Sequence, residues 1–127
     1  MKEPQKSNLT RAEEEIMLIL WKIQSGFVRD ILNHFKDPKP AYNTVSTIVR
    51  ILEDKGFVAH KAFGKSHQYY PLISKSQYSR HQISNLVSGY FSNSFKDLVS
   101  FMAEEEDLSL RDLDELKKII NNKNKKP

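Results

Sequence analysis

Residues 41–58 have the sequence AYNTVSTIVRILEDKGFV, whose apolar positions repeat with the period of an α-helix. Four aliphatic side chains spaced i, i+3, i+4 and i+7 share one face; they are Val45, Ile48, Val49 and Leu52. The opposite face carries short polar side chains and one cation at the same spacing, namely Asn43, Ser46, Thr47 and Arg50. Gly56 follows, and glycine readily adopts the left-handed conformation that ends a helix. The stretch therefore predicts a helix over residues 42–55 with an apolar back and a polar front.

On the N-terminal side, the sequence predicts two further helices. The first follows Thr10, which has the spacing of a capping box with Glu13. Its apolar face has the same four-point spacing and consists of Ile16, Ile19, Leu20 and Ile23. A shorter helix is expected over residues 28–35. Pro38 and Pro40 then require a turn, because proline cannot continue a helix.

On the C-terminal side, the sequence predicts a β-hairpin. The runs FVAHKAF (57–63) and HQYYPLI (67–73) are rich in β-branched and aromatic residues, as strands are. Residues 64–66, Gly-Lys-Ser, lie between them as the tip. Pro71 cannot donate a hydrogen bond to a neighbouring strand, so the second strand is expected to end there. Helix, short helix, helix and hairpin, in that order, predict a winged helix-turn-helix.

The polar face of helix 42–55 favours a contact with DNA. The major groove admits one α-helix, which needs an apolar back to hold it to its own domain and short polar side chains toward the bases. A cation at the hairpin tip suits a contact with a backbone phosphate. The residues that we expect to bind DNA are Tyr42, Asn43, Thr44, Ser46, Thr47, Arg50, Lys55, Lys61, Lys65 and Ser66.

The charge pattern agrees with a polyanionic partner. The formal net charge is only +4, but the charges are segregated along the chain. Residues 55–96 are 42 positions without a carboxylate side chain, and they carry six lysines and arginines. A basic stretch of this kind is typical of a surface that meets nucleic acid.

Residues after 74 are predicted to be helical only. Their apolar stripes have few residues of the same chain to bury them, so we expect two copies to pair through them. The expected dimer interface consists of Ile83, Leu86, Val87, Tyr90, Phe95, Leu98, Val99, Met102, Leu113, Leu116 and Ile120. The fold class is therefore mainly α with a small β-hairpin. We expect a winged-helix DNA-binding domain over residues 1–73, and a helical dimerisation domain with a basic tail over residues 74–127.

A resemblance to a known family covers roughly residues 9–120. The stretch 41–58, together with LTRAEEEIMLILWK (9–22) and FGKSHQYYPLIS (63–74), closely resembles the penicillinase-repressor family of bacterial regulators, of the BlaI/MecI/CopY type. Residues 90–109, YFSNSFKDLVSFMAEEEDLS, are similar to its C-terminal region. The resemblance implies a homodimeric repressor that binds a palindromic operator. It also implies release by proteolysis in the dimerisation region, with a sensor-linked protease as a further partner.

Three of the departures from the family pattern bear directly on function. The first of the two threonines that often open the recognition helix is Asn43 here. The Asn-Phe bond that is cut in the β-lactam branch is absent, so the expected cleavage region is Ser100, Phe101 and Met102. The chain has no cysteine, which excludes copper sensing through the C-terminal cysteine motifs of the copper-responsive branch.

Several other function classes lack support in the sequence. No nucleophile elbow or glycine-rich phosphate loop is present, so we expect no enzymatic activity and no cofactor. No apolar run approaches the roughly 20 residues that span a bilayer. The N-terminus also lacks the apolar core of a signal peptide, so we expect a cytoplasmic protein without a membrane partner.

The histidines do not indicate a metal site. They show no H-x-x-x-H pairing. With the hairpin tip at residues 64–65, His67 faces Ala62. His60 faces Tyr69, so these two histidines are not opposite each other. We therefore expect no bound metal.

Two alternatives remain open at the level of sequence. A winged helix that binds protein should expose large apolar residues on helix 42–55, and the polar face of this helix argues against it. A repressor with a small-molecule pocket between the winged helix and the dimerisation helices is the other alternative, and no polar cluster favours it.

Overall fold

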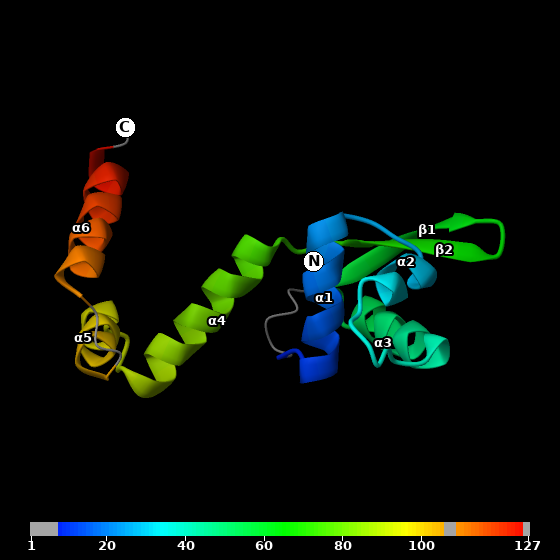
Figure 1. Cartoon of the computed structure of the whole chain (residues 1–127), viewed down its shortest axis with the longest axis horizontal. Helices are drawn as coiled ribbons and strands as arrows, with labels where there is room; N and C mark the ends of the chain where they lie inside the picture. Colours follow the sequence, from blue (N-terminus) through cyan, green and yellow to red (C-terminus); the bar gives the residue numbers. More distant parts are fainter. Residues whose placement is uncertain (1–7, 106–108, 126–127) are drawn as a thin grey trace. The chain divides into compact units, whose positions relative to one another are not determined.

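The computed structural model describes residues 8–105 and 109–125, and it confirms a mainly helical fold with one β-hairpin (Figure 1). The chain divides into two compact units, Met1–His81 and Gln82–Pro127. In chain order the elements are α1 (Arg11–Ile23), α2 (Val28–Asn33), α3 (Tyr42–Asp54), β1 (Val58–Phe63), β2 (Ser66–Pro71), α4 (Lys75–Tyr90), α5 (Phe95–Glu105) and α6 (Leu110–Lys125).

Helix α1 begins with the predicted capping box. The Thr10 hydroxyl accepts a hydrogen bond from Glu13 N at 3.1 Å, and Thr10 N donates to Glu13 Oε1 at 2.9 Å. Both backbone amides lack a partner within the helix, so the two side chains satisfy them reciprocally. The buried face of α1 contains Ile16, Met17 and Leu20.

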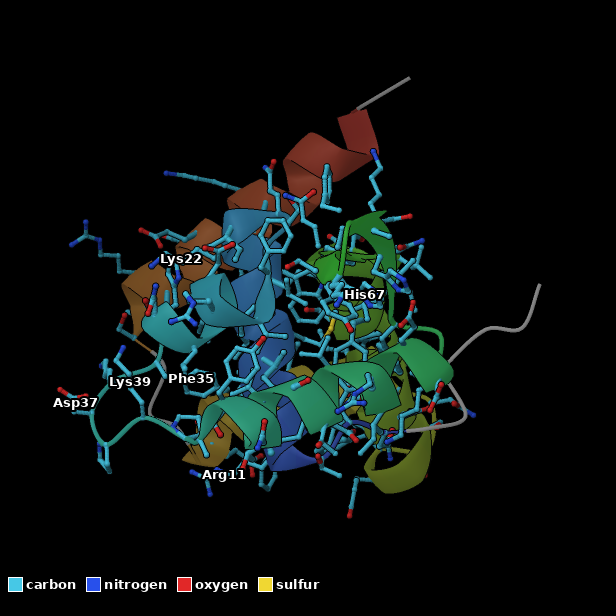
Figure 2. The ribbon with its side chains drawn as sticks, turned by 90° about the vertical axis from the view of Figure 1, so that its right-hand side faces the viewer. Arg11, Lys22, Phe35, Asp37, Lys39 and His67 are labelled. Atoms are coloured by element: carbon cyan, nitrogen blue, oxygen red, sulfur yellow. The ribbon has the colours of Figure 1, made fainter. Side chains whose placement is uncertain are left out.

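The core of the first unit lies between α1, α2, α3 and the hairpin. Helix α3 buries the aliphatic face that its sequence predicts, with Val45, Val49 and Leu52 inaccessible to solvent. The turn before α3 is held by Lys39, whose ammonium donates to Asn33 O at 3.1 Å and to Phe35 O at 2.8 Å (Figure 2). A lysine there satisfies carbonyls that the end of α2 leaves without partners.

The hairpin has the register that follows from a tip at residues 64–65. His60 pairs with Tyr69, Ala62 pairs with His67, and β2 ends at Pro71. Gly26 adds a further pairing on the other edge of β2, because Gly26 N donates to Tyr69 O at 2.9 Å and Tyr69 N donates to Gly26 O at 2.8 Å.

Glycine at position 26 leaves room for two neighbouring side chains. A Cβ there would lie 2.8 Å from Ile23 Cδ1 and 3.1 Å from Asp30 Cβ. A side chain at this position would therefore require the Ile23 side chain to move and would crowd Asp30.

The first unit extends into α4, as far as His81. It therefore continues beyond residue 73, near which the sequence predicts the domain boundary. Tyr78 is the reason, because it is only 8% exposed and packs against Trp21 and Phe57 with ring centroids 5.9 and 5.8 Å away. Its hydroxyl accepts a hydrogen bond from Leu9 N at 3.3 Å. The first turns of α4 are thereby part of the core of the winged helix.

The second unit contains the remainder of α4 together with α5 and α6. Val87 is buried in it, and the rings of Phe91 and Phe101 pack with centroids 5.6 Å apart. Ser92 and Asn93 turn the chain with positive φ angles of 50° and 64°. In the described part of the chain, no helix has the length and apolar character needed to cross a membrane.

Candidate nucleic-acid interface

The front of α3 presents an exposed polar face, as its sequence predicts. Asn43, Thr47 and Arg50 are exposed, and Ser46 is half-buried between them. Arg50 leans back along its own helix, with Nε 3.4 Å from Ser46 O. Its Nη2 also lies 3.5 Å from the Ser46 hydroxyl, so both contacts are long and stay within α3, and the exposed guanidinium can reach an acceptor outside the chain. Thr44 is also exposed, on the side of α3 that borders a groove against α1.

The hairpin carries the cations expected of a wing. Lys61, Lys65 and Ser66 are all exposed, and the tip of the hairpin extends past α2 and α3 (Figure 1). The tip is anchored by Phe63, whose ring packs edge-on against Phe27 with centroids 5.8 Å apart. This contact positions the wing against the start of α2, which in turn packs on α3.

A cleft of about 560 Å³ separates α3 from the wing, and we call it the α3–wing cleft. Its lining residues are Phe27, Val28, Arg29, Asp30, Tyr42, Ser46, Phe63, Lys65, Ser66, His67 and Tyr69. The cleft brings together four residues of the predicted DNA-binding set, Tyr42, Ser46, Lys65 and Ser66. It adds His67, and also Arg29, which no recognisable pattern in the sequence marks as a binding residue.

The wing side of the cleft carries two stacked histidines. His60 and His67 are not opposite each other in the register, as predicted, but they are diagonal neighbours. Their ring centroids are 3.9 Å apart and their planes differ by 9°. His60 Nδ1 donates to Glu53 Oε2 at 2.6 Å, which ties the pair to the last turn of α3. Burial and the nearby Glu53 carboxylate raise the pKa of the adjacent Tyr69 phenol.

Lys55 lies at the end of α3 but is engaged within the protein. Its ammonium is 2.8 Å from Glu13 Oε1, and the side chains of Lys55 and Glu13 are 26% and 6% exposed. Burial by itself would raise the pKa of Glu13. The hydrogen bonds from Lys55 and from the Thr10 backbone, with the positive charge of Lys55, outweigh burial and hold this pKa below its usual range. The structure thus places Lys55 in an ion pair that joins α3 to α1.

The apolar stripes of the second unit are largely exposed in the single chain. Among the residues expected at the dimer interface, Val87 is buried, Leu98 and Leu113 are half-buried, and Ile120 lies outside the residues whose side chains are described. The exposed members are Ile83, Leu86, Tyr90, Phe95, Val99, Met102 and Leu116. The expected cleavage residues Ser100, Phe101 and Met102 lie within α5 and are exposed.

The family model described as Penicillinase repressor matches residues 9–122 of the chain. The chain belongs to the penicillinase repressor family. The methicillin resistance regulatory protein MecI of Staphylococcus aureus (strain N315) is 31% identical over 118 residues, which are 91% of this chain and 94% of MecI. The penicillinase repressor of Bacillus licheniformis is 27% identical over 120 residues, with 93% and 94% of the two chains covered.

Among solved structures, the DNA-binding domain of the repressor BlaI has the same fold. It superposes with a TM-score of 0.51 at 26% sequence identity, covering 61% of this chain and 94% of the domain. The winged-helix fold predicted from the sequence is thereby confirmed. Membership of the penicillinase repressor family makes the chain a DNA-binding transcriptional repressor rather than an enzyme.

Proposed function

We propose that this member of the penicillinase repressor family works as a homodimer that represses transcription by occupying a palindromic operator. The observation that carries the proposal is the division of α3 into a buried aliphatic back and an exposed polar front. Asn43, Thr47 and Arg50 are positioned to meet base edges, and Lys65 and Lys61 on the wing to meet backbone phosphates. Occupancy of the operator blocks transcription without any chemical step.

The exposed apolar surface of the second unit supports the homodimer. Seven apolar residues of the expected interface are exposed in the single chain, including Tyr90 at 80% exposed. Contiguous exposed apolar side chains are costly in water, and pairing two copies removes them from it. A two-fold dimer presents two α3 helices to DNA, and two matching half-sites then follow from the symmetry.

Proteolysis in α5 is the proposed route of release. Ser100, Phe101 and Met102 are exposed, and the ring of Phe101 packs on that of Phe91. Cleavage there by a sensor-linked protease would divide the apolar surface that joins the two copies. The separated winged helices would then bind their half-sites singly and weakly. Lys55 is not assigned to DNA in this proposal, because its charge is paired with Glu13.

The test is fluorescence-anisotropy titration of the full chain with its own promoter and with a scrambled duplex, across salt concentrations. We expect a preference for the promoter of about a thousandfold or more, with affinity that falls steeply as salt rises. Equal and weak binding to both duplexes would contradict the proposal and favour a winged helix that recognises protein. Light scattering of the same sample measures the oligomeric state.

A further inference from the structure

The α3–wing cleft has cations on two of its walls. Arg29 comes from α2 and Lys65 from the hairpin tip, and both are exposed. Neither takes part in an ion pair among the described residues. The acid in the lining, Asp30, has Oδ2 2.8 Å from Phe27 N, so its charge is held at the start of α2. The cleft therefore offers two uncommitted positive charges to an anion.

The histidine pair gives the cleft a charge that depends on protons. His67 lines the cleft beside α3 (Figure 2) and stacks on His60, which is bonded to Glu53. Two charged imidazoles 3.9 Å apart repel each other, and the Glu53 carboxylate offsets one positive charge. An anion in the cleft supplies a second negative charge, on the side of His67.

The groups that face the histidine pair come from all the neighbouring elements. They are Arg29 and Asp30 of α2, Tyr42 and Glu53 of α3, Tyr69 of β2, and Lys65 of the tip, and Arg50 of α3 acts on the adjacent Tyr69. The cations outnumber the acids on the cleft side, and Glu53 lies on the side of His60. His67 is thus the ring that an incoming anion approaches first.

We propose that the α3–wing cleft seats a phosphodiester of the DNA backbone, and that the histidine pair takes up a proton when this phosphate binds. The inference rests on the proposed function. With α3 in the major groove and the wing on the same duplex, the strand between them passes over the cleft. The proton comes from solvent and goes to the His67 imidazole, and no other bond is made or broken. Operator affinity consequently rises as the pH falls.

The first test compares operator affinity at pH 6 and pH 8 at constant ionic strength. We expect the dissociation constant of the wild type to be about tenfold smaller at pH 6, because histidine is the side chain that titrates in this range. His67→Gln removes the titrating group, so its affinity should not change with pH. His67→Phe keeps a stacked ring without a charge and should give the same flat profile. The control is His34→Gln, because His34 contacts the backbone oxygen of Asp30 but does not line the cleft, so this variant should keep the wild-type profile.

Calorimetry counts the proton directly. Titration of operator into the wild type at pH 7, in two buffers with different enthalpies of ionisation, should show net proton uptake, and His67→Gln should show none. Arg29→Ala should make the dependence of log affinity on log salt shallower by about one unit, because one phosphate contact is lost. The control Lys22→Ala removes the same charge from α1, outside the cleft, and should leave the slope unchanged (Figure 2).

The outcomes separate the inference from the proposed function. Specific binding that is independent of pH, or proton uptake that persists in His67→Gln, would overturn the inference and leave the repressor intact. If Arg29→Ala showed the same dependence of log affinity on log salt as the wild type, the placement of a phosphate in the cleft would be wrong. Absence of specific binding at every pH would overturn both.

Discussion

Replacement of Lys55 by methionine should destabilise the winged helix by removing charge from a nearly buried pair. In the wild type, Glu13 Oε1 accepts hydrogen bonds from Lys55 Nζ at 2.8 Å and from Thr10 N at 2.9 Å. In Lys55→Met, Oε1 of Glu13, whose side chain is only 6% exposed, keeps the hydrogen bond from Thr10 N and loses the one from Lys55. Methionine is an unbranched side chain of similar length to lysine without a charge, so the change tests the charge of Lys55 more than its packing.

The magnitude lies between two limits. Removing one partner of a fully buried pair costs about 3–5 kcal/mol, whereas an exposed pair contributes about 0–1 kcal/mol. The burial of Glu13 is close to that of a fully buried pair. The Lys55 side chain is about a quarter exposed, so in the variant water partly replaces the lost hydrogen bond to Glu13. We therefore expect the free energy of unfolding to fall by about 2 kcal/mol at pH 7.

The loss of unfolding free energy in Lys55→Met should become smaller as the pH falls. The pKa of Glu13 is lower in the folded protein than its ordinary value of 4.5. The stabilisation from Glu13 is therefore present at neutral pH and is lost as the pH falls from about 4.5 through the folded value. Once Glu13 is protonated, the loss of Lys55 matters less. The difference between wild type and Lys55→Met should shrink between pH 7 and about pH 4.

The assay is urea unfolding followed by circular dichroism, at one protein concentration because pairing of chains affects stability. A double-mutant cycle with Glu13→Gln should give a coupling energy of about 1–2 kcal/mol between the two side chains. Lys61→Met, which removes an exposed lysine of the wing, should change stability by less than about 0.5 kcal/mol. A Lys55→Met variant as stable as the wild type at pH 7, or a deficit that does not vary with pH, would refute the reasoning.

Substitutions at four further residues test other parts of the structure. Arg50→Ala should weaken operator binding by about 1–3 kcal/mol if its guanidinium meets a base, and an equal loss on scrambled DNA in anisotropy titrations would assign it to the backbone instead. Lys65→Ala should flatten the salt dependence of binding by about one unit, and an unchanged slope would remove Lys65 from contact with phosphate. Leu86→Glu should give monomers in light scattering, and a persistent dimer would exclude Leu86 from the interface. Tyr78→Ala should lower the free energy of unfolding by about 3 kcal/mol; Tyr78→Phe, which loses only the 3.3 Å bond from Leu9 N, should cost less than about 1 kcal/mol.

The elements whose signals are local could be predicted from the amino-acid sequence alone. The aliphatic face of α3 is buried where its i, i+3, i+4, i+7 spacing predicts, because side chains at those positions share one side of any helix. The capping box of α1 depends on two residues three positions apart. The register of the hairpin follows from a short tip, which leaves the strands few ways to pair.

Contacts between residues that are far apart in the sequence became apparent only in the folded structure. Lys55 and Glu13 are 42 positions apart, and nothing in either segment marks them as partners, so Lys55 had the same sequence signal as a DNA-binding lysine. Tyr78 lies in a polar stretch, yet its ring completes the core of the winged helix. These contacts depend on how the helices pack against one another, which periodicity along one helix does not specify.

The α3–wing cleft shows the same division. Its α3 residues could be named from the polar face of one helix, but Arg29 enters it from α2 and His67 from β2. The stack of His67 on His60 needs a diagonal neighbour across the hairpin, and the twist of the two strands sets that distance. Local spacing in the sequence determines which face of an element is polar; the packing of three elements determines which polar side chains share one site.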